Sequence, residues 1–241
     1  MDSVRFPGKV LWKFLDMPMI EHVYRRACIA LDSKDVYITT NDAAIISHMK
    51  SIGANVIISG QQHNDGTSRA AEAAGTLNYD FIVVLQADEI LIDPDHLIQL
   101  INEIKTNPEI KFWNLVTSLD SESELHDGNI VKCTLNVNGD VMFIFRQNPF
   151  NGFNHKIFKK IMGTIAFEHE SLKSLVALPD TTYQIANSTE QLKILEYGNR
   201  LHGLIVENSY PSINLISDIS IVKKLSEESL SQIKILKQYV S

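Results

Sequence analysis

Three short polar segments stand along the chain in an order that suits a nucleoside triphosphate and a divalent metal. The first, residues 3–9, reads Ser-Val-Arg-Phe-Pro-Gly-Lys and places Arg5 and Lys9 on either side of a Pro-Gly turn. Two cations there would neutralise phosphate charge, and Gly8 would let the backbone approach a ligand closely. The alternative is an ordinary surface turn with two solvated cations, because short glycine-containing motifs often match by chance.

The second segment is a polar loop that leads into a helix. Residues 63–69 read His-Asn-Asp-Gly-Thr-Ser-Arg, and an alanine-rich helix is expected from Thr67 to Leu77. Thr67 at the helix N-terminus would cap it, while exposed backbone amides bind an anion or a base edge. A capped helix after a polar loop, with no ligand, is the alternative.

The third segment sets an acid just beyond a buried strand. Residues 80–85 are almost entirely apolar, which is typical of a central parallel strand, and Gln86, Asp88 and Glu89 follow. Ligands of open α/β sheets bind beyond the carboxyl ends of the strands. Asp88 would hold Mg²⁺, which takes one or two carboxylates together with substrate phosphates.

The segments that must position these residues alternate between strand and helix. In the first half of the chain, strands are expected at 35–40, 55–59 and 80–85, and helices at 42–52, 67–77 and 94–105. This order predicts an α/β fold with a doubly wound, mostly parallel sheet. Such a sheet normally begins with a strand that feeds the phosphate loop. Because residue 3 already starts that loop, the N-terminal strand is expected to be missing.

After residue 110 the pattern changes to short strands around a hairpin. Strands are expected at 112–119, 130–137, 141–146, 161–167 and 203–207, and helices at 168–175, 189–200 and from 217 to the end. Asn138-Gly139 is a strong hairpin signal. We expect a single domain over residues 1–241, with a lid or a dimerisation flap at about 120–160.

Composition narrows the class of protein. The chain has 241 residues, 44% of them hydrophobic, and a formal net charge of −7. That charge argues against general nucleic-acid binding. Its two cysteines, Cys28 and Cys133, form no metal-binding or disulfide pattern. Because no apolar run is long enough to span a membrane and no signal peptide is recognisable, a cytoplasmic protein is expected.

The three segments together resemble the CMP-Kdo synthetases, the 3-deoxy-manno-octulosonate cytidylyltransferases of the sugar nucleotidyltransferase superfamily. The likeness runs over nearly the whole chain and implies a Rossmann-like fold with an inserted β-hairpin flap for dimerisation. Its motifs are the phosphate loop at 3–9 with the segment at 16–20, the HxSGTxR-type segment at 63–69, the QGDE segment at 86–89, and the EQLxxLxxG helix at 190–198.

The resemblance implies an enzyme that joins CTP and a 3-deoxy-ulosonic acid, releases pyrophosphate, requires Mg²⁺ and forms a homodimer. Its catalytic set would be Arg5, Lys9 and Asp88. The nucleotide-binding set would be Ser3, Gly8, Lys9, Gly66, Thr67, Arg69 and Gln86. Arg146 and Gln191 would bind the sugar acid, although Arg146 is alternatively a cation at the edge of the hairpin. The product would serve surface polysaccharide biosynthesis, as in lipopolysaccharide.

The chain also departs from the family pattern. Where the family carries a metal-binding acid in its GxDTxEDL segment, this chain has Asn214, a poorer Mg²⁺ ligand. The family's His-x-Gly-x-Tyr segment corresponds to residues 161–165, Ile-Met-Gly-Thr-Ile. The leading hypothesis is therefore a cytidylyltransferase for a Kdo-like or related acidic sugar. The alternatives are a catalytically impaired relative that binds nucleotide in a regulatory or partner role, and a nucleotidyltransferase that uses another base.

Overall fold

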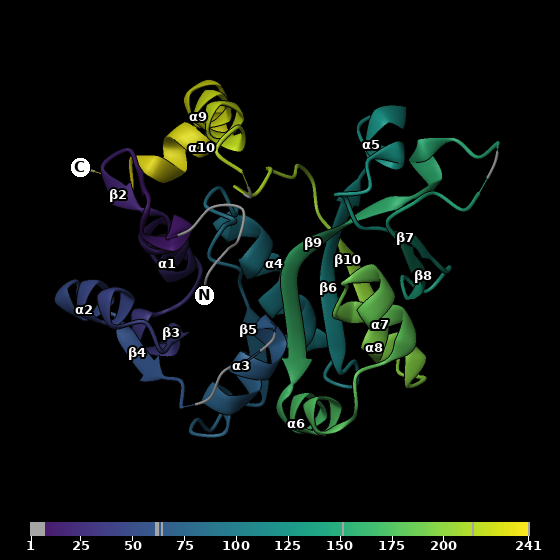
Figure 1. The fold of residues 1–241 in the computed structure, drawn as a ribbon, viewed down its shortest axis with the longest axis horizontal. Helices are drawn as coiled ribbons and strands as arrows, with labels where there is room; N and C mark the ends of the chain where they lie inside the picture. Colours follow the sequence, from purple (N-terminus) through teal and green to yellow (C-terminus); the bar gives the residue numbers. More distant parts are fainter. Residues whose placement is uncertain (1–7, 61–62, 64, 151, 214, 241) are drawn as a thin grey trace. The chain divides into compact units, whose positions relative to one another are not determined.

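The computed structural model describes residues 8–60, 63, 65–150, 152–213 and 215–240, and Figure 1 shows its ribbon. The described residues form two compact units, a first unit that lies within 1–62, 85–102 and 210–241 and a second unit that lies within 63–84 and 103–209. In the described part of the chain, no helix is long and apolar enough to cross a membrane. The expected loss of an N-terminal strand concerns residues outside that part.

The first unit contains a parallel pair of strands covered by helices. Its elements are η1 (Lys9–Leu11), β1 (Lys13–Phe14), β2 (Met17–Pro18), α1 (Met19–Ala30), η2 (Ser33–Asp35), β3 (Tyr37–Thr40), α2 (Ala43–Ser51), β4 (Asn55–Ile58), α9 (Asp218–Glu228) and α10 (Leu230–Leu236). As expected, β3 and β4 run parallel and α2 joins them. Asp42 caps α2 by accepting hydrogen bonds from the N–H groups of Ala44 and Ile45. Apolar side chains of α1, α2 and both strands share one core.

The second unit contains a mixed sheet with the strand order β10-β6-β9-β7-β8, in which β5 also pairs with β9. Its elements are α3 (Gly66–Ala74), β5 (Phe81–Val84), β6 (Phe112–Ser118), α5 (Glu122–His126), β7 (Lys132–Leu135), β8 (Val141–Phe145), η3 (His155–Ile157), β9 (Lys159–Glu168), α6 (His169–Ala177), α7 (Thr182–Asn187), α8 (Gln191–Glu196) and β10 (His202–Ile205). α4 (Pro94–Thr106) begins in the first unit and ends in the second.

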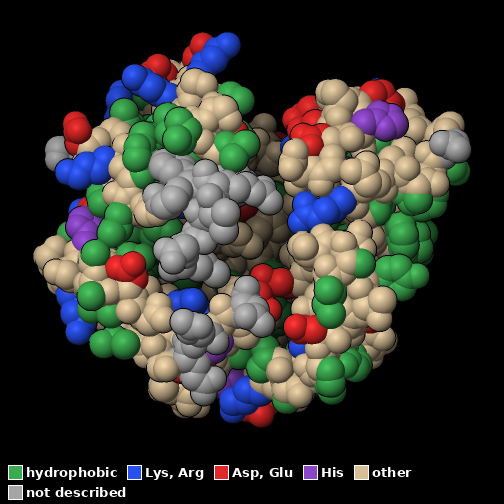
Figure 2. All heavy atoms as spheres, viewed as in Figure 1, with side chains coloured by type: hydrophobic (Ala, Val, Ile, Leu, Met, Phe, Trp, Pro, Cys, Tyr) green, Lys and Arg blue, Asp and Glu red, His purple; other side chains and the backbone are tan. Residues whose placement is uncertain are grey.

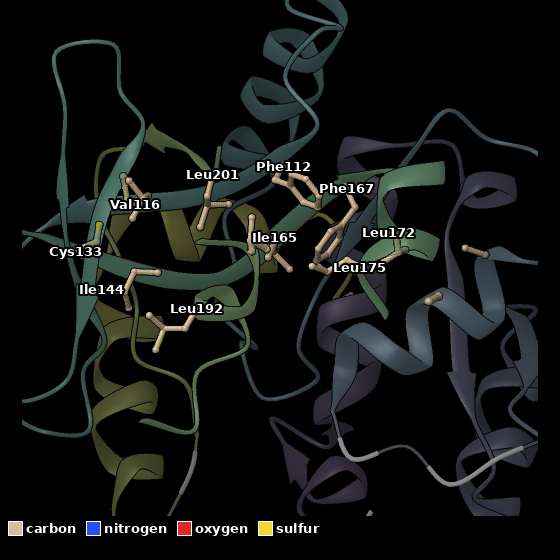
Figure 3. Packing of buried hydrophobic residues seen from close by; sticks show 14 residues of the cluster. Phe112, Val116, Cys133, Ile144, Ile165, Phe167, Leu172, Leu175, Leu192 and Leu201 are labelled. Atoms are coloured by element: carbon tan, nitrogen blue, oxygen red, sulfur yellow. The ribbon is translucent and has the colours of Figure 1, made fainter. Parts of the chain in front are cut away.

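One hydrophobic cluster joins this sheet to the helices beside it (Figure 3). Phe112 of β6 and Phe167 of β9 meet edge to face, with ring centroids 6.1 Å apart. Leu172 and Leu175 of α6 pack into the same cluster, as does Leu192 of α8. The cluster thus holds α8 against the sheet, and α8 begins at the predicted site residue Gln191.

The expectation of a mostly parallel sheet is wrong for the second unit. β6 and β10 are parallel, but β9 runs antiparallel to β5, β6 and β7. Ser118 at the end of β6 lies opposite Lys159 at the start of β9. The segment between β6 and β9, which carries β7 and β8, therefore starts and ends at the same end of the β6–β9 pair, so β9 runs back along β6. The long β6 and β9 ribbons lie side by side in Figure 1.

Two helix expectations also need correction. The helix expected at 189–200 covers only α8, and a separate helix, α7, precedes it. The helix expected from 217 to the end is divided at Ser229, whose extended backbone (φ −78°, ψ 118°) ends α9 and begins α10. The apolar period continues across Ser229, which explains why the sequence suggested one helix.

Candidate active site

Lys9 and Asp88, both predicted as catalytic, lie in contact in the first unit. Lys9 Nζ is 2.7 Å from Asp88 Oδ2, and the two side chains are only 16% and 13% exposed. Gly8 precedes Lys9 with φ 69°, a left-handed backbone that favours glycine and turns the chain into η1. Because little solvent reaches the pair, its attraction is screened less than that of a surface ion pair.

The backbone of Ile213 completes this arrangement. Its N–H donates to the backbone oxygen of Asp88 at 3.0 Å, and its own carbonyl accepts from Lys9 Nζ at 3.4 Å. Ile213 is fully buried in a cluster that includes Phe14. Three segments far apart in sequence thus meet at one ammonium group. Ser3, Arg5 and Asn214, which were predicted for the same site, lie outside the described residues.

The carboxylate of Asp88 is a single donor of the type that suits Mg²⁺ shared with a substrate. Within the described ranges, no three His, Cys, Asp or Glu side chains are grouped so that they could hold a metal. Mg²⁺ does not require such a cage, because it retains water and takes one or two carboxylates together with phosphate oxygens. Asp88 supplies one hard oxygen donor of that type. Gln86, two residues earlier, is exposed, and its backbone oxygen accepts a hydrogen bond from the backbone N–H of Glu89 at 3.2 Å.

In the second unit, the N-terminus of α3 already receives a carboxylate. Thr67 Oγ1 donates a short hydrogen bond to Glu190 Oε2, and the Thr67 N–H lies 3.3 Å from the same oxygen. The cap of α3 is Asp65, whose Oδ1 accepts from the Ser68 N–H at 2.7 Å, and not Thr67 as expected. The helix therefore begins at Gly66, one residue earlier than predicted.

The environment of Glu190 favours its protonated form. Burial raises the pKa of the Glu190 carboxyl above its usual value, and the nearby Asp65 carboxylate adds to this shift. Hydrogen bonds from Thr67 and Gly66 oppose it. Glu190 thus combines a partly desolvated acid with the donors of a helix N-terminus.

The loop before α3 is tied to the helix by a second contact. His63 Nε2 lies 2.5 Å from Glu72 Oε2, and the His63 side chain is nearly buried. Arg69, predicted to bind nucleotide, is half-buried on the same helix. The sequence alone gave His63 no role beyond the loop, whereas the structure shows that it fastens the loop to α3.

Arg146 holds the turn between α7 and α8. Its Nε donates to Asn187 O at 2.7 Å, its Nη2 to Ser188 O at 3.1 Å, and its Nη1 to Asn129 O at 3.1 Å. The guanidinium of Arg146 is thus bonded to backbone carbonyls, and its alternative role as a cation at the edge of the hairpin stays a prediction. Its expected contact with the sugar acid remains a prediction. Ser188 has a left-handed backbone (φ 49°), a conformation that is uncommon for residues other than glycine.

A buried lysine, Lys132, binds the backbone of Arg146. Lys132 is fully buried, and its Nζ donates to the carbonyl oxygens of Asp127, at 2.7 Å, and Arg146. Burial lowers the pKa of Lys132 to about 8. The sequence did not single out Lys132, because a lysine in a short strand reads as an exposed residue.

Gln191, the other predicted sugar-binding residue, contacts the centre of the sheet. Its Nε2 donates to Asn114 Oδ1 at 3.0 Å. Asn114 is fully buried in β6 and donates in turn to Leu115 O and Met162 O, at 2.7 and 2.9 Å. The sequence placed Asn114 in a strand but gave no sign that its amide would orient Gln191.

Comparisons with known proteins identify the family of the chain. A family model described as cytidylyltransferase matches residues 1–201. The 8-amino-3,8-dideoxy-manno-octulosonate cytidylyltransferase of Shewanella pealeana is 32% identical over 226 residues, 91% of this chain and 92% of that protein. The 3-deoxy-manno-octulosonate cytidylyltransferase of Solibacter usitatus is 32% identical over 236 residues, 95% of this chain and 92% of that protein.

A solved structure is similar over the same length. It is a CMP:2-keto-3-deoxy-manno-octonic acid synthetase complexed with CTP, with a TM-score of 0.87, 26% sequence identity and 94% of each chain covered. Its α/β nucleotidyltransferase fold, a mixed sheet with helices, is the fold found here. The match over residues 1–201 includes the Lys9–Asp88 pair and the Thr67–Glu190 contact. The chain is a cytidylyltransferase and belongs to that family.

Proposed function

We propose that this chain transfers the cytidylyl group of CTP to a 3-deoxy-ulosonic acid of the Kdo type, either Kdo or its 8-amino counterpart. The observation that carries the proposal is the Lys9–Asp88 contact of 2.7 Å. It sets a cation suited to phosphate beside a carboxylate suited to Mg²⁺, within a family that uses CTP. The two 32% identical relatives that act on Kdo and 8-amino-Kdo support the class of sugar.

The reaction forms one bond and breaks one. The anomeric hydroxyl of the sugar attacks the α-phosphorus of CTP, the bond from that phosphorus to the bridging oxygen breaks, and pyrophosphate leaves while the hydroxyl proton passes to solvent. Mg²⁺, when bound, neutralises charge on the phosphate oxygens. The protein's task is alignment and charge stabilisation. Lys9 with Arg5 would hold the triphosphate, and Asp88, with the weaker Asn214, would hold the metal.

The remaining predicted residues complete this account as proposals. Gly8, Ser3, Gln86 and the segment Gly66, Thr67 and Arg69 would contact the nucleotide. Gln191 would contact the sugar, with its side chain oriented by the hydrogen bond from its Nε2 to Asn114 Oδ1 at 3.0 Å. The Arg146 hydrogen bonds to the turn at Ser188 would keep Gln191 at the start of α8 in place.

Dimerisation through the flap is part of the proposal. The hairpin exposes apolar side chains, with Val137 fully exposed, Met142 60% exposed and Phe143 44% exposed. Hydrophobic side chains gather over the β7–β8 hairpin at the right edge of Figure 2. An exposed apolar cluster of this kind is typical of a protein interface. A homodimer formed through this hairpin would account for the exposed side chains. Its cytoplasmic location and its role in lipopolysaccharide synthesis belong to the same proposal and rest on the family.

A panel of nucleotides and acidic sugars tests the proposal. The full chain is incubated with Mg²⁺, with CTP or UTP, and with Kdo or 8-amino-Kdo, and products are identified by mass spectrometry. The proposal expects a CMP-sugar and pyrophosphate from CTP with at least one of the two sugars, and little product from UTP. CTP binding without product from either sugar would favour an impaired relative and contradict the proposal.

A further inference from the structure

We propose that Lys9 is a place-holding cation on Asp88, which competes with the metal until a nucleotide draws the ammonium group away. The inference rests on the proposed function, since it takes Asp88 as the metal ligand and Lys9 as a phosphate ligand. It adds a coupling between the two binding events. Lys9 thereby acts as a positioning residue for metal loading as well as a contact for the triphosphate.

The contacts of Lys9 carry this inference. Its Nζ lies 2.7 Å from Asp88 Oδ2 and donates to Ile213 O at 3.4 Å. Two of the three ammonium hydrogens are therefore directed to the carboxylate and to the segment that pairs with it. A metal that binds Asp88 through Oδ2 must displace this ammonium group, and one that binds through Oδ1 would share the same carboxylate with it.

Charge makes coexistence of the two cations unfavourable. The Lys9 and Asp88 side chains are 16% and 13% exposed, so water screens a nearby charge poorly. Mg²⁺ placed on Asp88 while Lys9 stayed would set a divalent cation against a monovalent one. Lys9 withdrawn with no new partner would become a poorly hydrated, unpaired charge, which is costly.

A nucleotide resolves both problems in one exchange. A triphosphate offers anionic oxygens to Lys9 and to the metal together, so each charge leaves one partner and gains another. Metal and nucleotide then bind with positive coupling, and linkage requires that each raises the affinity of the other by the same factor. The Ile213 N–H donates to the Asp88 backbone oxygen at 3.0 Å, a bond that involves neither Lys9 Nζ nor the carboxylate, so the exchange leaves the backbone at Asp88 held.

Binding of Mn²⁺ without nucleotide tests the inference directly. Free Mn²⁺ is measured by electron paramagnetic resonance as it is titrated into the full chain and into Lys9→Gln. We expect Lys9→Gln to bind Mn²⁺ more tightly than the wild type, by a factor within the roughly 5- to 150-fold range of typical couplings. Lys9→Arg, which keeps the positive charge, should bind Mn²⁺ as weakly as the wild type.

Two further variants locate the effect. Lys13→Gln removes an exposed lysine four positions away and should leave Mn²⁺ affinity unchanged. Lys9→Gln combined with Asp88→Asn should lose the gain, because the carboxylate freed by the first change is absent. Circular dichroism checks the fold of each variant, and Lys9→Met, which keeps the aliphatic stem, replaces Lys9→Gln if that variant does not fold.

The outcomes separate this inference from the proposed function. Equal Mn²⁺ affinity of the wild type and Lys9→Gln would overturn the place-holder, even in an enzyme that makes CMP-sugar. An equal gain in Lys13→Gln would overturn it as well, since general charge would then be the cause. If the wild type neither binds CTP nor makes CMP-sugar, the proposed function fails, and this inference fails with it.

Discussion

Glu190 Oε2 accepts hydrogen bonds from both Thr67 Oγ1 and the Thr67 N–H, the latter at 3.3 Å. Two motifs that resemble separate parts of a substrate site are thus bonded to each other. Glu190 takes the place at the N-terminus of α3 that an external anion would otherwise favour. The nucleotide contact predicted for Gly66 and Thr67 therefore has to form beside Glu190.

Glu190→Gln should stabilise the protein at neutral and alkaline pH. The folded-state pKa of Glu190 is raised, so the folded protein holds this proton at pH values where the unfolded chain has lost it. Stability from this group is therefore present below the usual carboxyl pKa and is lost as pH rises through the folded pKa. Urea unfolding should show that the variant is more stable than the wild type at pH 8 and that the two proteins are about equally stable near pH 4.

The exposed Glu109 provides the control. Glu109→Gln removes a carboxylate from the surface of the second unit and should change stability by less than about 0.5 kcal/mol. A Glu190→Gln protein less stable than the wild type at pH 8 would show that the ionised carboxylate at α3 is favourable, contrary to this prediction.

Arg146→Ala should destabilise the second unit. The change removes three charge-assisted hydrogen bonds to the carbonyls of Asn129, Asn187 and Ser188, a loss of about 2–3 kcal/mol. Arg200→Ala is the matched control, because Arg200 pairs with Asp140 while 63% exposed and should contribute less than about 1 kcal/mol. Unchanged stability of Arg146→Ala together with a raised KM for the sugar would favour direct sugar binding instead.

Two glycines of the predicted nucleotide site should respond differently to alanine. Gly8 has φ 69°, so Gly8→Ala should cost about 1–2 kcal/mol although open space surrounds a new Cβ. Gly66 has no such backbone strain and equal space, so Gly66→Ala should be neutral or stabilise by about 0.4–1 kcal/mol. Thermal unfolding of both variants checks this contrast. Equal losses would mean that positive φ is not what requires glycine at residue 8.

Lys132 should make stability rise at alkaline pH. Its pKa is lowered from 10.5 to about 8 in the folded protein, so between those values the unfolded chain binds more protons. As pH rises from 8 to 10.5, the free energy of unfolding of the wild type should increase relative to that of Lys132→Met by up to about 3 kcal/mol. Urea unfolding at pH 7 and pH 9.5 measures this difference. A constant difference at both values would show that the Lys132 pKa is not lowered.

The features that the sequence predicted well depend on local rules. The Asp42 cap, the β3–α2–β4 crossover and the hairpin around Asn138-Gly139 follow from capping, periodicity and turn chemistry. The proximity of Lys9 and Asp88 was expected because the segments at 3–9 and 86–89 occur together in the family that the sequence resembles. These features were predictable because they depend on residues close together in sequence or on a combination of motifs typical of the family.

The features that the sequence missed depend on which distant segments meet. The direction of β9 is set by Ser118 and Lys159 lying opposite each other, and periodicity carries no information on direction. The hydrogen bond from Thr67 to Glu190 joins residues 123 positions apart. The buried position of Lys132 depends on the carbonyl oxygens of Asp127 and Arg146, which accept from its Nζ and which the sequence pattern does not bring together.

Pyrophosphate release from CTP with Kdo and Mg²⁺, measured for the wild type, Asp88→Asn and Asp95→Asn, tests the central claim most directly. Asp95 is an exposed acid in the first turn of α4 and controls for loss of charge. We expect Mg²⁺-dependent release from the wild type and Asp95→Asn, and at least a roughly 100-fold loss in Asp88→Asn, equivalent to about 2.7 kcal/mol of transition-state stabilisation. Release that survives in Asp88→Asn at the wild-type rate would contradict the assignment of Asp88 as the metal-binding carboxylate of this cytidylyltransferase.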